Sequence, residues 1–195
     1  MNAVKASVTR ERLIRAATEL IEEGGYAAAS VAAVTERAGI VAGGLYYHFA
    51  SKSELFLEVF RTAAERELEA METAGAQAGS FAERFEAVIS TYAMSALESR
   101  GLAWALVYEP VDPLVDAERL AYRRRYCDRM AELLRRGIDA GAIPDQDARL
   151  AAAAVIGAIA EALVGPLSPL AGASVKEAEI VAGIVQFCHR AIGAE

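Results

Sequence analysis

Residues 31–55 of this 195-residue chain read VAAVTERAGIVAGGLYYHFASKSEL, and this stretch decides the fold. Ser30 is suited to cap a short helix that runs to about residue 38, since its hydroxyl can accept from the first unpaired amides. Gly39 follows, and glycine tolerates the positive φ of a sharp turn. A second short helix is predicted over 41–49. Two short helices joined by a tight glycine turn form a helix-turn-helix.

A further helix is predicted on each side of this unit. Apolar residues recur at helical spacing after Thr9, which can act as an N-cap, and Gly24 with Gly25 ends that pattern. Beyond the unit, Ser51 and Glu54 have the spacing of a capping box. We therefore expect one helix before the helix-turn-helix and a long helix directly after it.

The remainder of the chain has the composition of a helical protein. Alanine, leucine, glutamate and arginine dominate, and five prolines fall at or near predicted helix ends. Further helices are expected over 52–74, 80–99, 102–108, 116–140, 148–164 and 175–192. The sequence therefore predicts an all-α protein of about nine helices.

Residues 31–55 resemble the DNA-binding signature of TetR (tetracycline-repressor-like) transcriptional regulators. The resemblance covers about residues 9–60. It implies a three-helix DNA-binding domain over residues 1–52 and a helical ligand-binding and dimerisation domain over residues 53–195. It also implies a cytoplasmic repressor that a small molecule releases from a palindromic operator, without a cofactor. The matching positions are Val34, Ala38, Gly39, Ile40, Gly43, Leu45, Tyr46, Tyr47, His48, Phe49, Lys52 and Leu55.

The second helix of the motif is the candidate reading helix. Its length suits the major groove, with its N-terminal residues toward the base edges. Family analogy assigns Tyr46, His48 and Lys52 to the phosphates, with Tyr47 either joining them or packing beneath the helix. Taken singly, these aromatic residues would also suit a core, but the complete spacing favours DNA. The candidate DNA-binding residues are Ser30, Thr35, Val41, Ala42, Gly43, Gly44, Tyr46, Tyr47, His48 and Lys52.

The part of the motif that is expected to read bases lacks polar side chains at four positions. Relatives often carry polar or basic side chains near four positions that are here Ala32, Val41, Ala42 and Gly44. Two interpretations stay open. Apolar contacts to thymine methyls, Thr35 or Arg37, and DNA shape can supply the specificity. Alternatively, the protein binds its operator weakly without its partner or the correct ligand state. Val41 also leaves the reading helix without a Ser or Thr cap.

One monomer reads half a site, so dimerisation is expected. Two reading helices must lie about 34–36 Å apart, or a multiple of it, on a palindrome. The predicted helices at 148–164 and 175–192 combine small residues with apolar ones and are the candidate homodimer surface. A purely internal core is the alternative for both.

Aromatic residues suggest an apolar effector pocket in the second domain, where the resemblance implies one. A plain core explains most of them equally well. The effector itself is not identified by the sequence. The candidate pocket residues are Tyr92, Leu97, Trp104, Tyr108, Tyr122 and Tyr126.

Charge and cysteine content bound the function further. Residues 1–52 carry six basic and five acidic residues, whereas the rest of the chain carries 14 and 22, so the first segment is only weakly basic. Cys127 and Cys188 have no metal-ligand spacing and are expected to be reduced thiols. The apolar stretch near residues 150–175 is interrupted by Glu161, Pro166 and Pro169, so no membrane partner is expected.

Two other classes of function compete with a regulator. An enzyme is disfavoured because the chain shows no Ser-His-Asp set, metal-ligand cluster or phosphate-binding glycine loop. A helical bundle that binds only proteins is the second alternative. A gel shift separates both from a DNA-binding regulator.

Overall fold

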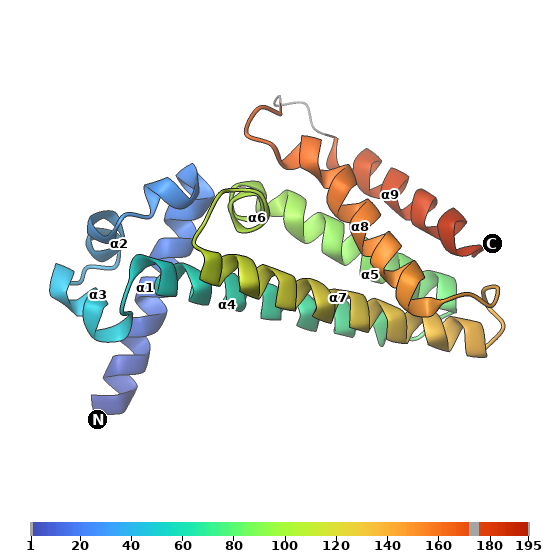
Figure 1. The fold of residues 1–195 in the computed structure, drawn as a ribbon, viewed down its shortest axis with the longest axis horizontal. Helices are drawn as coiled ribbons and strands as arrows, with labels where there is room; N and C mark the ends of the chain where they lie inside the picture. Colours follow the sequence, from blue (N-terminus) through green and yellow to red (C-terminus); the bar gives the residue numbers. More distant parts are fainter. Residues whose placement is uncertain (1, 172–175, 195) are drawn as a thin grey trace. The chain divides into compact units, whose positions relative to one another are not determined.

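The computed structural model describes residues 2–171 and 176–194, apart from the side chains of residues 2–5 and 42. Over this part of the chain it contains nine α-helices and no strand, which confirms the all-α prediction (Figure 1). The helices are α1 Asn2–Ala28, α2 Val31–Arg37, α3 Ala42–His48, α4 Lys52–Gly75, α5 Phe81–Glu98, α6 Arg100–Val107, α7 Pro113–Asp139, α8 Ala148–Leu167 and α9 Glu177–Ile192.

The helices form two compact units whose boundary differs from the one predicted at residue 52. The N-terminal unit comprises Met1–Ala64 and Ser99–Leu120, and the C-terminal unit comprises Glu65–Glu98 and Ala121–Glu195. The division therefore falls within α4 and within α7. The physical reason is α6, which packs against α1 and so joins the DNA-binding helices. A long-range contact of this kind has no local sequence signature.

The N-terminal unit is built on α1. This helix begins at Asn2 rather than after Thr9, because residues 2–8 contain no glycine or proline that would stop it. Gly24 (φ −155°) and Gly25 (φ 73°) leave helical geometry, but they kink α1 rather than end it, since the helix runs on to Ala28. The apolar face of α1 is buried together with the inner faces of α2 and α3. Figure 1 shows how the ribbons of these three helices are arranged. Leu13, Ile21, Val34, Leu45 and Phe49 lie in this core.

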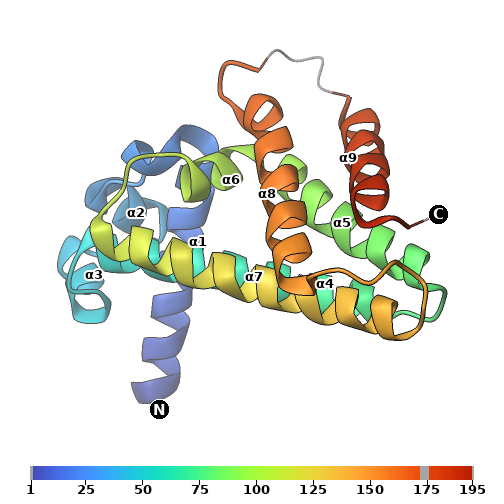
Figure 2. The same cartoon turned by 45° about the vertical axis from the view of Figure 1, so that its right-hand side comes forward.

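The C-terminal unit contains α5, α8 and α9 packed against one another (Figure 2). Asp147 caps α8 by accepting hydrogen bonds from the Arg149 and Leu150 amides at 2.9 and 3.1 Å, as the sequence predicts. This helix continues through Pro166 to Leu167, slightly beyond its expected end. The predicted start of α9 at residue 175 lies outside the described residues.

Candidate nucleic-acid interface

α2 and α3 form the helix-turn-helix that the sequence predicts. The Ser30 hydroxyl caps α2 by accepting from the Ala33 amide at 3.2 Å. Gly39 has a φ of 63°, so the turn uses the left-handed conformation that favours glycine. The Arg12 guanidinium donates to the Ala38 carbonyl and holds the turn against α1.

The outer surface of α3 carries two exposed tyrosines. Tyr46 and Tyr47 are 59% and 80% exposed, whereas Leu45 and Phe49 face the core. Tyr47 therefore does not pack beneath the helix, which was one of its two predicted placements. Its ring lies 5.0 Å from the partly exposed His48 ring in an edge-to-face arrangement. Two hydroxyls and an imidazole are thus gathered at the C-terminal end of α3.

The first turn of α3 is open to solvent. Val41 is 81% exposed, and a Cβ built on Gly43 would meet no atom within 4 Å. A Cβ on Gly44 would instead lie 2.5 Å from the Ile40 side chain, so Gly44 has a packing role in addition to its place on the motif. The side chain of Ala42 lies outside the described part of the chain.

Thr35 and Arg37 were expected near the bases, but both side chains bond to other groups of the protein. Thr35 is buried, and its hydroxyl donates to the Val31 and Ala32 carbonyls at 2.9 and 3.1 Å. Contrary to the prediction, its hydroxyl therefore does not face outward. Arg37 makes two 2.8 Å hydrogen bonds to Glu23, and this contact lowers the pKa of that carboxyl. The Thr35 contacts are of a common kind, because short polar side chains often bond to the backbone of their own helix.

The Lys52 side chain contacts the end of α1 within the same unit. Its ammonium donates to the Tyr26 carbonyl at 2.7 Å and lies 3.9 Å from the centre of the Tyr26 ring. Burial lowers the pKa of Lys52, and the nearby Glu109 carboxylate opposes that shift. The Lys52 ammonium is thus held by the end of α1 in this structure, and its contact with a phosphate stays a prediction.

Val41 leaves α3 without a side-chain cap, as expected from its residue type. We expect Val41→Ser to raise the free energy of unfolding by about 1 kcal/mol, because a serine hydroxyl can accept from an unpaired α3 amide. Urea unfolding of the DNA-free protein measures this. Val41→Ala is the matched control, and equal stability of the serine and alanine variants would contradict the capping argument.

The predicted effector residues are divided between the two units. Trp104 and Tyr108 belong to the N-terminal unit, with ring centroids 4.9 Å apart. The other four belong to the C-terminal unit. There Leu97 is fully buried, and the rings of Tyr92 and Tyr126 lie 5.5 Å apart.

Two glutamates of α4 that were not predicted as site residues bind the hydroxyls of Tyr122 and Tyr126. Tyr126 donates a 2.7 Å hydrogen bond to Glu67, and Tyr122 donates one of the same length to Glu65. Burial raises the pKa of Glu67 to about 7, although the Tyr126 hydrogen bond acts against the shift. In contrast, Arg125 lowers the pKa of Glu65 to about 2. Glutamates are frequent along α4, so no local pattern distinguishes the half-buried Glu67 from the others.

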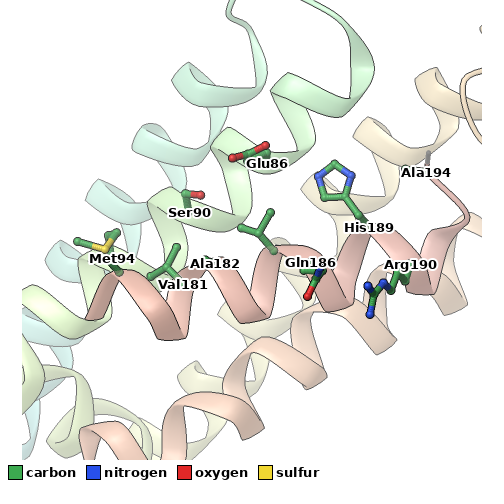
Figure 3. A pocket seen from close by; sticks show the side chains of 11 residues that line it. Glu86, Ser90, Met94, Val181, Ala182, Gln186, His189, Arg190 and Ala194 are labelled. Atoms are coloured by element: carbon green, nitrogen blue, oxygen red, sulfur yellow. The ribbon is translucent and has the colours of Figure 1, made fainter. Parts of the chain in front are cut away.

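A groove of about 640 Å³ lies between α5 and α9 (Figure 3). Glu86 and His189 lie toward one end of it, and Met94 and Val181 toward the other. The His189 ring contacts Phe85 edge to face at 5.3 Å. Its Nε2 atom is buried and, among the described atoms, has no hydrogen-bond partner. The groove combines apolar and polar walls, and the sequence did not predict it.

α8 and α9 expose more apolar surface than a purely internal core would leave. α8 is long and apolar enough to cross a membrane by length and composition alone, yet only about a third of its most apolar window is buried inside the chain. Leu150 on α8 and Phe187 on α9 are 69% and 59% exposed. One helix of this kind is weak evidence for a membrane span, and its inner face packs on α5 and α9.

Solved structures of other proteins share this fold. No curated protein matches the chain. Among solved structures, FadR of Bacillus halodurans is 19% identical, with a TM-score of 0.78. The alignment covers 91% of this chain and 96% of the FadR chain. FadR of Bacillus subtilis in complex with stearoyl-CoA is 21% identical, with the same TM-score and coverage. A TetR/AcrR regulator of Thermobifida fusca is 24% identical (TM-score 0.74) and covers 92% of this chain and 95% of its own.

Two family models match the sequence itself. Residues 13–59 match the model for bacterial regulatory proteins of the tetR family, and these residues contain the whole helix-turn-helix. Residues 78–163 match the model for the tetracyclin repressor-like C-terminal domain. The chain therefore belongs to the TetR family of transcriptional regulators.

Proposed function

We propose that this protein is a repressor that binds a palindromic operator through α3 and is released from it by a small-molecule effector. One observation carries the proposal: Tyr46 and Tyr47 stand exposed on the outer surface of α3 in an intact helix-turn-helix. An exposed tyrosine hydroxyl is a suitable phosphate donor, and phosphate contacts fix the register of a reading helix.

The phosphate contacts are expected to come mainly from neutral donors. Arg10 pairs with Glu58, Arg12 donates to a backbone carbonyl and Arg37 pairs with Glu23. Tyr46, Tyr47 and the partly exposed His48 would then hold the backbone. Val41, at the start of α3, would contact thymine methyls, and DNA shape would supply further specificity.

A homodimer through α8 and α9 would join the two half-site readers. The exposed Leu150 and Phe187 side chains and the partly covered α8 support this assignment. A twofold dimer presents the same surface on both copies, so each of these side chains would contact the partner. Size-exclusion chromatography with light scattering tests the assembly, and a monomer at all concentrations would contradict it.

The effector is proposed to bind in the C-terminal unit near Tyr92 and Tyr126. Stearoyl-CoA is the first probe to test, because FadR of Bacillus subtilis, which has a similar fold, was solved in complex with it. Both α4 and α7 contribute residues to the two units, and movement of α4 would couple effector binding to DNA release. Only an effector with different affinity for the two states can drive release.

We expect the protein to act in the cytoplasm, without a cofactor or enzymatic activity.

A gel shift against palindromes from the gene's own upstream region tests DNA binding directly. Specific retardation that an unrelated duplex does not compete away is expected. Absence of specific retardation at every salt concentration would favour an enzyme or a protein-binding bundle instead.

Tyr46→Phe and Tyr47→Phe are each expected to weaken operator binding by about tenfold, since a hydrogen bond to a charged group contributes about 1.5–3 kcal/mol. The slope of log K against log salt should not change, because a neutral hydroxyl releases no counterion. Fluorescence anisotropy with a labelled operator measures both quantities. Thr73→Ala, which removes an exposed hydroxyl in the C-terminal unit, is the control and should bind like the wild type. Wild-type affinity in both α3 variants would remove these hydroxyls from the interface.

A further inference from the structure

Both backbone polar groups of Tyr26 are held by side chains that are distant in sequence. Its amide donates to the Glu109 carboxylate at 2.8 Å. Its carbonyl accepts from the Lys52 ammonium at 2.7 Å. The ring of Tyr26 meets Phe56 edge to face, with the centroids 4.4 Å apart. We call Tyr26, Lys52 and Glu109 the Tyr26 clamp.

The Tyr26 clamp lies at the base of the helix-turn-helix. Tyr26 follows the break in α1 at Gly24 and Gly25 and precedes the α2 cap, Ser30. Lys52 is the first residue of α4 and follows α3 closely. The contact between Tyr26 and Lys52 therefore closes the segment that contains α2 and α3. The direction in which that segment leaves α1 depends on the backbone at residues 24–26.

Contacts of both its backbone and its carboxylate fix the position of Glu109 in this site. The backbone of Gly25 has a φ of 73°, and a Cβ there would collide with the Glu109 carboxylate. The Arg119 guanidinium donates to the Glu109 carbonyl at 3.0 Å and to the Ala105 carbonyl at 2.9 Å. The carboxylate also lies close enough to Lys52 to oppose the effect of burial on that ammonium.

The start of α6 is also attached to α1, but here the carboxylate belongs to α1 and the amides belong to α6. The Glu22 carboxylate accepts hydrogen bonds from the Gly101 and Leu102 amides at 3.3 and 2.6 Å, so it caps the start of α6. Glu22 of α1 therefore caps α6. In turn Glu109, just after α6, accepts from the amide of Tyr26, just after the break in α1. The position of the α1 end and the position of α6 depend on each other.

We propose that Glu109 is a positioning residue for operator binding, which sets the direction of α2 and α3 through Tyr26 and Lys52 without touching DNA. The proposal rests on the proposed DNA-binding function. It places control of operator affinity in the connection between α6 and α7, far along the chain from the reading helix.

Operator affinity of Glu109 variants tests this role. Glu109→Ala removes the acceptor of the Tyr26 amide and the charge beside Lys52, and we expect it to weaken binding at least about tenfold. Glu109→Gln keeps an acceptor of the same length and should recover most of that loss. The slope of log K against log salt should equal the wild-type slope in both variants, because no phosphate contact is removed. Glu118→Gln is the control, since Glu118 forms an ion pair with the partly exposed Arg61 in the same unit and does not contact the Tyr26 clamp in the described part of the chain.

Lys52→Met separates the two possible roles of the lysine and does not depend on the folding of Glu109→Ala. A positioning role predicts weaker binding with an unchanged salt slope, whereas a phosphate contact predicts a slope smaller by about one. Wild-type affinity of Glu109→Ala, or a reduced slope in Lys52→Met, would overturn the proposal. A wild-type protein that shows no specific binding would instead overturn the proposed function.

Discussion

Gly101→Ala is expected to lower the free energy of unfolding by about 3 kcal/mol, which is at the upper end of the cost of overpacking a close contact. Gly101 is the second residue of α6, and a Cβ there would overlap the carbonyl of Glu22 in α1. That obstacle is backbone, so it cannot rotate away as a flexible side chain could. α6 must move instead, and the two hydrogen bonds that Glu22 accepts from the start of α6 would be lost with it.

Urea unfolding with two probes measures the effect. Trp104 is the single tryptophan of the chain and lies in α6, so its fluorescence follows this contact directly, while circular dichroism follows all the helices. Gly43→Ala is the matched control, because a Cβ at Gly43 meets nothing within 4 Å and alanine favours a helix by up to about 1 kcal/mol. Stability of Gly101→Ala equal to or above the wild type would mean that α6 does not pack this closely on α1.

Glu67→Gln is expected to change the pH dependence of stability. Burial raises the pKa of Glu67 to about 7 from its usual 4.5, so the fold favours the protonated carboxyl. Between these two values the folded chain binds more protons than the unfolded chain, and the free energy of unfolding falls as the pH rises. The contribution of Glu67 amounts to about 3 kcal/mol of lost stability once the pH exceeds about 7.

Glutamine cannot ionise, so Glu67→Gln should be more stable than the wild type at about pH 8 by up to about 3 kcal/mol. The two proteins should converge toward about pH 4.5, where Glu67 is protonated in both states. Chemical unfolding across this pH range measures the difference. Glu69→Gln, at an exposed position on the same helix, is the control and should follow the wild type. Parallel curves for wild type and Glu67→Gln would show that the carboxyl is well solvated.

Local features of the fold were predictable because their causes lie within a few residues. Half of the predicted Ser51–Glu54 capping box forms, with the Glu54 amide donating to the Ser51 hydroxyl at 3.1 Å. The Glu54 carboxylate also reaches back, but it accepts from the Ala50 amide rather than from the Ser51 amide that a complete capping box uses. The left-handed turn at Gly39 follows from the same kind of information.

Features that depend on distant partners could not be read from the sequence. Lys52 lies at the expected point after the motif, but its orientation depends on Tyr26 and on Glu109, which lies in the connection between α6 and α7. No local pattern around Glu109 indicates that its carboxylate contacts the chain near residue 26. Thr35 illustrates a smaller error, because a hydroxyl in a short helix can bond to its own backbone as readily as it faces solvent.

The reciprocal attachment of α1 and α6 bears on how such regulators can be recombined. A chimera that joins this chain's first 52 residues to another effector domain would discard Glu109, Gly101 and all of α6. The transplanted fragment would keep its tyrosines but leave a face of α1 bare and the Tyr26 amide without its acceptor. The portable module is therefore discontinuous: a working hybrid must carry residues 99–120 along with the N-terminal segment, or be rebuilt to replace them.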